Sequence, residues 1–292
     1  MKRWLATLGL IGVTVVWGWT FVLVRDAVSA WGVMDFLAVR FAIAAAVMLP
    51  LWGRRLKLPT LKTGLWIGAI LAAGYTLQTW GLTLTTATNA GLITGLFVVL
   101  APVADRLIYG TRISRLAVAA VGLSLAGMVL LTGQTPTTVV LGDLLVLSCA
   151  VAFGVHIAVL SRHSPEHEPA VLATAQMTAL AAIFLLLWRL AGEPSLPPRE
   201  VWFALALTGV VASAVAYSIQ TFAQQHLSTA RTAVILTLEP VFAGFFGFVL
   251  AGERLGPLQW VGAALIFGAL TLSEIYPAFR RPPAVKDGGV KT

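Results

Sequence analysis

The sequence predicts an all-α integral membrane protein in which ten transmembrane helices form two inverted five-helix repeats. Three observations lead to this fold class. Hydrophobic residues make up 58% of the 292-residue chain and charged residues only 11%, whereas soluble proteins average about 25% charged residues. Long uncharged runs recur from one end to the other. The segment 75–81 (YTLQTWG) has a near copy at 217–223 (YSIQTFA), 142 residues later and close to half the chain length.

Ten apolar runs lie between the charged gaps, and each is close to the roughly 20 residues that an α-helix needs to cross the bilayer. The expected spans are 4–24, 34–52, 63–83, 88–108, 115–132, 141–160, 170–190, 202–222, 230–250 and 257–275. A closed β-barrel would instead alternate apolar and polar residues. The first run is longer than the core of a secretory signal peptide, so we expect it to be retained as the first span.

Lysine and arginine residues are distributed unequally between the two sides that these spans define. With the N-terminus inside, 15 of the 20 lie on the inner side, four lie on the outer side, and Arg40 lies within the second span. Because cytoplasmic loops are enriched in these residues, we expect both termini in the cytoplasm. The net charge of +8 therefore indicates topology rather than nucleic-acid binding.

Two further pairs of segments indicate an internal repeat. Trp17-Gly18 matches Phe153-Gly154, and GTRI at 110–113 matches GERL at 252–255. Each half would hold five spans, and because five is odd, the second half enters the membrane from the opposite face. We expect a first repeat over 1–133, a second over 134–276 and a flexible cytoplasmic tail over 277–292.

Polar residues recur within the apolar runs at spacings that place them on one helical face. Tyr75 and Gln78 share a face of the third span, and Tyr217 and Gln220 share a face of the eighth. An unpaired polar group in hydrocarbon costs several kcal/mol. We therefore expect both pairs to face a shared cavity, although a hydrogen-bonded seam between helices that binds no ligand is an alternative.

Other residues extend this candidate cavity. His156 takes the position that matches Thr20 in the first span, and a buried imidazole needs a partner and can carry protons. Glu239 lies about 15 Å into the ninth span, where it can bind a proton, pair with an ammonium group or satisfy backbone donors. Arg40 lies inside the second span and can snorkel to the interface, and a structural role is favoured over ligand binding. The candidate binding residues are Trp17, Thr20, Tyr75, Gln78, Trp80, Asn89, His156, Tyr217, Gln220 and Glu239.

Enzymatic and metal-binding sites are not expected. Cys149 is the one cysteine, which excludes an intramolecular disulfide and a cysteine-based metal site. His163 and His167 lie in a short loop without the residues that would complete a catalytic or metal centre. The sequence has no P-loop and no region large enough for a separate nucleotide-binding domain. We expect no cofactor, no ATP-driven step and no nucleic-acid partner.

An ordered set of short motifs resembles the EamA-type branch of the drug/metabolite transporter superfamily. These motifs are Trp17-Gly18, Arg40-Phe41, LEPV at 238–241 and GERL at 252–255. The resemblance covers about 4–275 and implies export of small metabolites, among which amino acids are common cargo. Two features depart from a symmetric pattern: Gly110-Thr111-Arg112 replaces Gly-Glu-Arg in the first half, and Pro102 and Pro240 are 138 rather than 142 residues apart.

The expected function is secondary transport across the cell (inner) membrane. The cavity would offer aromatic surface and neutral hydrogen-bonding groups, which fits small neutral or zwitterionic metabolites, with amino acids, including aromatic ones, as the leading cargo. The scarcity of fixed charges in the expected cavity argues against phosphorylated cargo. A broad exporter of drugs or nucleobases and a non-transporting scaffold or sensor are the alternatives. The expected partners are a small-molecule substrate and the lipid bilayer, and the chain is expected to be a monomer, with a dimer left open.

Overall fold

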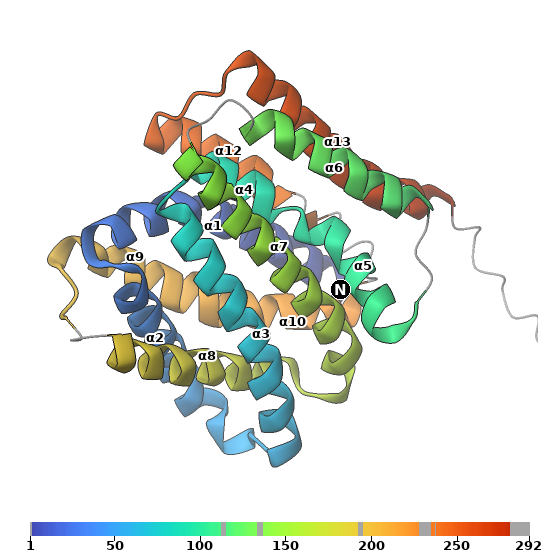
Figure 1. Ribbon diagram of the computed structural model, residues 1–292. Helices are drawn as coiled ribbons and strands as arrows, with labels where there is room; N and C mark the ends of the chain where they lie inside the picture. The colour runs from blue at the N-terminus through green and yellow to red at the C-terminus, as the bar shows by residue number, and fades with distance from the viewer. Residues whose placement is uncertain are drawn as a thin grey trace, which may run out of the picture.

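The structure is a computed structural model that describes residues 2–111, 115–132, 137–191, 195–227, 235–236 and 238–280. Within these ranges the regular elements are all helical, as the sequence predicts (Figure 1). The main helices are α1 (Lys2–Trp31), α2 (Val33–Trp52), α3 (Leu58–Leu82), α4 (Ala87–Thr94), α5 (Phe97–Tyr109), α6 (Arg115–Thr132), α7 (Thr137–His163), α8 (Pro169–Ala191), α9 (Trp202–Ala206), the π-helix η4 (Leu207–Val215), α10 (Ala216–His226), α12 (Leu238–Ala251) and α13 (Pro257–Arg280). Short 3-10 turns, η1 (Gly53–Arg55), η2 (Ser164–Glu166) and η3 (Arg199–Val201), lie between them.

Helix length and composition fit a membrane protein. Six helical stretches are long and apolar enough to cross a bilayer, namely Lys2–Trp31, Val33–Arg55, Ala87–Tyr109, Val139–Glu166, Pro169–Leu190 and Arg199–His226. Val118–Leu130, Leu238–Ala251 and Pro257–Ala269 are shorter apolar helices. Helix α3 has 25 residues but is not one of the six. Each expected span overlaps helix, while the ten-span topology stays a prediction.

Several sequence expectations fall outside the described residues. The start of the expected ninth span, with Arg231, Thr232 and Thr237, is one of them. The boundary between the expected repeats at 133–134 and most of the expected tail, 281–292, are the others.

Two of the expected spans are interrupted. The fourth is divided between α4, which ends at Thr94, and α5, which begins at Phe97. At this break a Cβ on Gly95 would lie 2.9 Å from Cγ of Pro240, so the glycine permits close contact with α12. The eighth span passes through the nine-residue π-helix η4, a conformation often found at functional sites.

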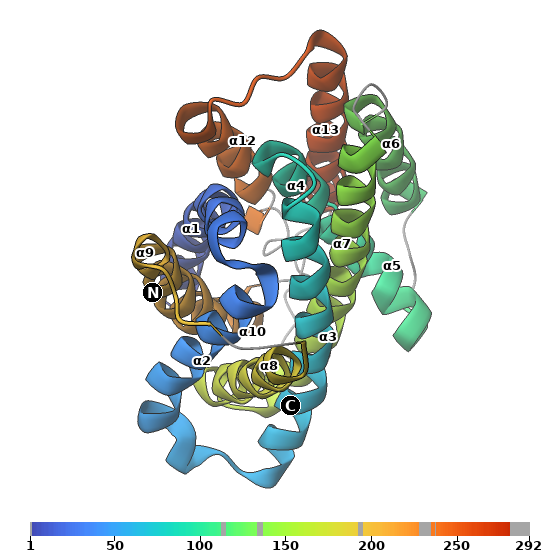
Figure 2. The ribbon, with the colours of Figure 1, turned by 60° about the vertical axis from the view of Figure 1, so that its left-hand side comes forward.

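Corresponding helices of the two halves make corresponding contacts. Helix α1 packs on α10 and α12, and in the other half α7 packs on α3 and α5; α2 packs on α8, α4 on α12 and α6 on α13. Figures 1 and 2 show α6 and α13 side by side at the edge of the bundle. Close approaches are paired as well, because a Cβ on Gly18 would meet Phe242 and Ala243, and one on Gly154 would meet Leu100 and Ala101. This pattern is what a pseudo-two-fold arrangement would produce.

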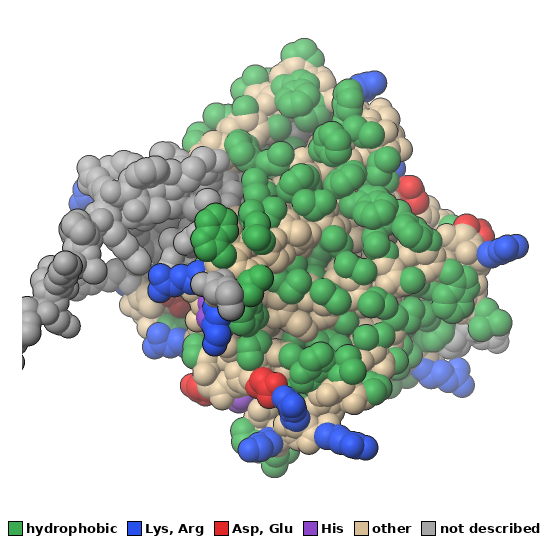
Figure 3. Space-filling view, turned by 180° about the vertical axis from the view of Figure 1, so that it is seen from behind, with side chains coloured by type: hydrophobic (Ala, Val, Ile, Leu, Met, Phe, Trp, Pro, Cys, Tyr) green, Lys and Arg blue, Asp and Glu red, His purple; other side chains and the backbone are tan. Residues whose placement is uncertain are grey.

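The outer surface is apolar over a wide area. In Figure 3 hydrophobic side chains cover the centre of the face, and charged side chains lie around its rim. Large exposed apolar residues include Trp4, Leu186, Phe245 and Trp260. Soluble monomers rarely expose contiguous apolar patches larger than a few hundred Å². The protein is therefore a multi-pass membrane protein whose apolar surface contacts lipid.

Candidate functional site

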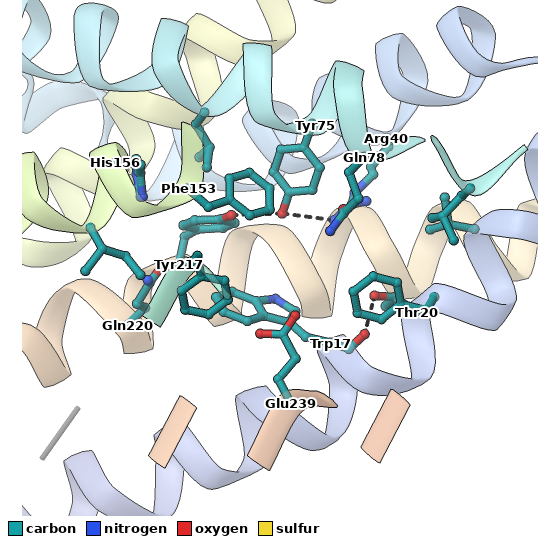
Figure 4. A pocket seen from close by; sticks show the side chains of 16 residues that line it. Trp17, Thr20, Arg40, Tyr75, Gln78, Phe153, His156, Tyr217, Gln220 and Glu239 are labelled. Atoms are coloured by element: carbon teal, nitrogen blue, oxygen red, sulfur yellow. Dashed lines mark hydrogen bonds between the residues drawn. The ribbon is translucent and has the colours of Figure 1, made fainter. Parts of the chain in front are cut away.

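A small pocket lined by polar and apolar side chains lies where α1, α2, α3, α5, α7, α10 and α12 meet (Figure 4). Its volume of about 40 Å³ accommodates water but not a metabolite, so binding a solute requires the helices to separate. The lining residues are Trp17, Thr20, Phe21, Val24, Arg40, Leu71, Tyr75, Gln78, Leu82, Phe97, Phe153, His156, Ile157, Tyr217, Gln220 and Glu239. Eight of the ten sequence-predicted residues are among them.

A larger groove of about 590 Å³ lies on the outside, between α4, α12 and α13. It is lined mainly by apolar side chains, including Leu92, Phe245, Phe248 and Trp260. Because specific recognition of a polar solute needs convergent polar groups, the smaller pocket is the better candidate for the functional site.

Two tyrosines, one from each half, meet at the pocket. The hydroxyl oxygens of Tyr75 on α3 and Tyr217 on α10 are 2.8 Å apart and share a hydrogen bond. Each tyrosine has an aromatic neighbour from the first helix of the opposite half. The ring centroids of Trp17 and Tyr217 are 5.5 Å apart, and those of Phe153 and Tyr75 are 5.4 Å apart. Because Trp17 and Phe153 are themselves sequence-matched, both halves contribute the same aromatic arrangement.

Arg40 is buried in this pocket, with 3% of its surface exposed. Its Nε donates to Oγ of Ser213 at 3.2 Å, and its Nη2 donates to the hydroxyl of Tyr75 at 3.4 Å. The guanidinium carbon lies 4.7 Å from the ring centroid of Tyr75 and 5.0 Å from that of Phe41. The expectation that Arg40 snorkels to the interface is wrong, because hydroxyl groups and aromatic faces replace water around it.

Glu239 supplies a buried acid at the start of α12, with 4% of its surface exposed. Its Oε2 has no hydrogen-bond partner within the described part of the chain. Figure 4 shows the carboxyl group directed toward Trp17, whereas Arg40 enters the pocket from the other side. No ion pair joins Arg40 to Glu239 or to any other described acid. The pocket therefore contains a basic and an acidic side chain that do not pair with each other directly.

The remaining polar residues have different degrees of hydrogen bonding. Nε2 of His156 lies 2.8 Å from Oε1 of Gln176, so the imidazole donates to the amide oxygen. Gln78 donates to Oγ1 of Thr94 at 3.2 Å. Gln220 is 2% exposed, and its Oε1 has no partner within the described ranges. Buried polar groups normally have partners, so this free oxygen is available to a ligand.

The two pocket residues of α1 with polar side-chain atoms, Trp17 and Thr20, bond to backbone carbonyl groups. Thr20 donates to the carbonyl of Trp17 at 2.7 Å, and Nε1 of Trp17 donates to the carbonyl of Ala212, in the π-helix, at 2.9 Å. The indole is thereby fixed against η4, and its ring faces Tyr217.

Two sequence-predicted residues do not line the pocket. Trp80 is 46% exposed on the outside of the bundle, because two residues after Gln78 a helix has turned by roughly 200°. Asn89 is buried, but it donates to Oδ2 of Asp143 at 3.3 Å in a separate cluster between α4 and α7. Both residues are therefore removed from the candidate site.

Sequence reasoning misassigned one pocket residue and missed the partner of another. A signal for Arg40 was available, because an ionisable residue within a span is by default a candidate functional residue. Gln176, the partner of His156, had no comparable signal, because it is recognisable only once α7 and α8 are placed together.

Removing the tyrosine hydroxyl groups should have unequal effects. We expect Tyr217→Phe to lower the free energy of unfolding by about 1 kcal/mol, since one hydrogen bond is lost. Tyr75→Phe should lower it further, because the bond from Arg40 is lost as well. The double variant should be no less stable than Tyr75→Phe alone. Thermal unfolding of the purified variants measures this, and strictly additive losses would contradict the shared bond.

Comparisons with known proteins agree with the membrane fold. The profile of the EamA-like transporter family matches residues 4–133 and again 140–274. An uncharacterized transporter of Archaeoglobus fulgidus is 38% identical over 278 residues, covering 94% of this chain and 87% of that protein. The uncharacterized inner membrane transporter YedA of Escherichia coli is 24% identical over 275 residues, covering 90% and 88%.

One further relative matches about half of this chain, and one solved structure matches nearly all of it. The threonine/homoserine exporter RhtA of Salmonella typhimurium is 27% identical over 150 residues, which are 51% of this chain and 50% of that protein. A solved crystal structure with 20% sequence identity superposes with a TM-score of 0.69, covering 94% of this chain and 99% of the other. At this identity the likeness concerns the fold alone.

Proposed function

Because the chain belongs to the EamA-like transporter family and is a membrane transporter, we propose that it exports small zwitterionic metabolites, with amino acids as the leading substrates. The relatives described above are named as transporters. The name of RhtA specifies threonine and homoserine, both zwitterionic amino acids. That similarity covers 51% of the chain, whereas the pocket residues of this protein come from both halves.

The observation that carries the proposal is that Arg40 and Glu239 are both buried in the pocket and do not pair with each other. A zwitterion offers one partner to each of these groups: its carboxylate can bind the guanidinium of Arg40, and its ammonium group can bind Glu239, whose Oε2 has no partner within the described residues. The rings of Trp17, Tyr217 and Phe153 then supply apolar surface for the substrate side chain. The site thus fits a zwitterion better than a phosphorylated or wholly apolar solute.

Transport would proceed by alternating access. In this proposal residues 1–133 and 134–276 are inverted repeats, both termini are cytoplasmic, and residues 277–292 form a tail. The bond between Tyr75 and Tyr217 would lie on the pseudo-two-fold axis. The exchangeable packing of the halves supports this arrangement, and rocking of one set of helices against the other would open the closed pocket to each side in turn.

Solute counterflow in proteoliposomes tests the proposal. Liposomes containing the purified protein would be loaded with unlabelled threonine, homoserine, phenylalanine or tryptophan. Uptake of the same labelled compound would then be compared with uptake by protein-free liposomes. We expect exchange of at least one amino acid. Exchange of nucleobases or lipophilic cations without amino acids would favour the broad exporter, and no exchange of any compound would favour the scaffold or sensor.

A further inference from the structure

A second buried acid, Asp143 on α7, lies outside the solute pocket. None of its surface is exposed. Oγ1 of Thr85 donates to Oδ1 of Asp143 at 2.5 Å, and Nδ2 of Asn89 donates to Oδ2 at 3.3 Å. Thr85 lies in the turn before α4, and Asn89 lies in the first turn of α4. Asp143 therefore connects a helix of the second half to the start of the broken fourth span.

No cation neutralises Asp143 within the described part of the chain. The nearest ionic pair at this end is Glu253 with Arg25. Glu253 also accepts from the backbone N–H groups of Ala87 and Thr88, at 2.8 Å each, so this pair caps the start of α4. Arg25 thus pairs with Glu253 and with the neighbouring Asp26, not with Asp143.

The elements that pack on α7 bring no other charge to Asp143. Gly81 of α3 and Leu84 of the following turn contact Gly142 next to it. Tyr75 on α3 and Tyr217 on α10 lie in the central pocket. The other titratable residues of the neighbouring helices lie toward the opposite end of α7, near His163: Lys62 on α3, Asp105, Arg106 and Tyr109 on α5, Arg115 on α6 and His226 on α10. Asp143 is therefore a lone acid between α4 and α7.

Asn89 can bind Asp143 in either protonation state. Its amide N–H donates to the carboxylate, while its Oδ1 is buried and has no partner among the described residues. The amide oxygen and nitrogen are nearly equal in size and can exchange places by rotation about the last side-chain bond. After that rotation a protonated Asp143 would donate to the amide oxygen. The unpaired oxygen is accounted for if the carboxyl group takes up a proton.

We propose that Asp143 is a proton-binding site, separate from the solute pocket, that links protonation to the position of α4. The far end of α4 reaches the pocket, where Thr94 accepts a hydrogen bond from Gln78. A carboxylate near the start of a helix stabilises it, and protonation removes that charge, so α4 would be held less firmly. The link to solute movement rests on the proposed function, but proton binding itself does not.

A proton fits the cluster better than a metal ion. Thr85 and Asn89 both direct hydrogen atoms, rather than oxygen lone pairs, at Asp143. Within the described residues no group of three or more His, Cys, Asp or Glu side chains could hold a metal.

Infrared difference spectroscopy tests proton binding directly. Spectra of the purified protein would be compared between about pH 5 and pH 8, in a Glu239→Gln background that removes the pocket acid. We expect a protonated-carboxyl signal that is lost in Asp143→Asn and kept in Asp105→Asn, a matched control whose side chain has no hydrogen bond within the described ranges. Carbon-13 labelling of aspartate in the same background shifts the frequency of an aspartate signal and so assigns it to an aspartate even if Asp143→Asn fails to fold. A signal that persists in folded Asp143→Asn, or whose frequency is unchanged by the label, overturns the proposal.

Flux measurements test the link to α4. With labelled threonine as the probe, Asp143→Asn should lose uptake driven by a pH gradient and keep counterflow at equal pH, whereas Asp105→Asn should keep both. Retained pH-driven uptake in Asp143→Asn overturns the link. If the unmodified protein fails to exchange threonine or any other amino acid, the proposed function fails, while the infrared result still decides whether Asp143 binds a proton.

Discussion

Replacing Glu239 with glutamine is expected to lower the affinity for a zwitterionic amino acid by roughly a hundredfold or more. Breaking a buried charge pair by removing one partner costs about 3 to 5 kcal/mol, and about 1.4 kcal/mol corresponds to a tenfold change. Glutamine keeps the shape of the side chain but leaves the substrate ammonium group without a counter-charge. Equilibrium binding of an amino acid identified by counterflow measures the change.

The fold should survive this substitution. Oε2 of Glu239 has no hydrogen-bond partner within the described residues, and glutamine has nearly the same shape, so the thermal midpoint of Glu239→Gln should be close to that of the unmodified protein. Glu166→Gln provides the matched control, because Glu166 is exposed in the loop after α7. Unchanged binding by Glu239→Gln, or an equal loss in Glu166→Gln, would show that Glu239 does not hold the ammonium group.

Apolar run length was sufficient to locate the helices. Each expected span overlaps helix because a run of about 20 apolar residues has few other stable forms in a bilayer. The two interruptions were not predictable in the same way. Gly95 divides α4 from α5 where α12 approaches through Pro240, and the sequence alone does not show that contact. Likewise, residues 207–215 have no sequence signal that distinguishes a π-helix from an α-helix.

Internal repetition was the most informative signal for the site. It singled out Tyr75 and Tyr217, whose hydroxyl groups meet although 142 residues separate them. Helical spacing explains why Trp80 was misplaced, since nearness in sequence to Gln78 does not put it on the same face. Arg40 was given a structural role because its partners, Ser213 and Tyr75, come from other helices. Residues whose role depends on several helices were therefore the ones that sequence reasoning missed or misassigned.

Replacing Arg40 with lysine is expected to lower the affinity for an amino acid by roughly tenfold to a hundredfold. Lysine keeps the positive charge but lacks the planar fork that binds a carboxylate through two parallel hydrogen bonds. A hydrogen bond to a charged group contributes about 1.5 to 3 kcal/mol, which converts to that range. The matched control is Arg189→Lys, because Arg189 is exposed on α8 and has no ion pair within the described residues.

Substrate analogues separate contact with the ligand from effects on packing. An amine that lacks the carboxylate should bind Arg40→Lys as well as it binds the unmodified protein, yet it should lose affinity for Glu239→Gln. A carboxylic acid that lacks the ammonium group should show the reverse pattern. This crossed result requires each charge to meet its own end of the substrate. If Arg40→Lys instead weakens both analogues equally, then Arg40 acts by holding Tyr75 in place, and the zwitterion hypothesis loses its anion-binding group.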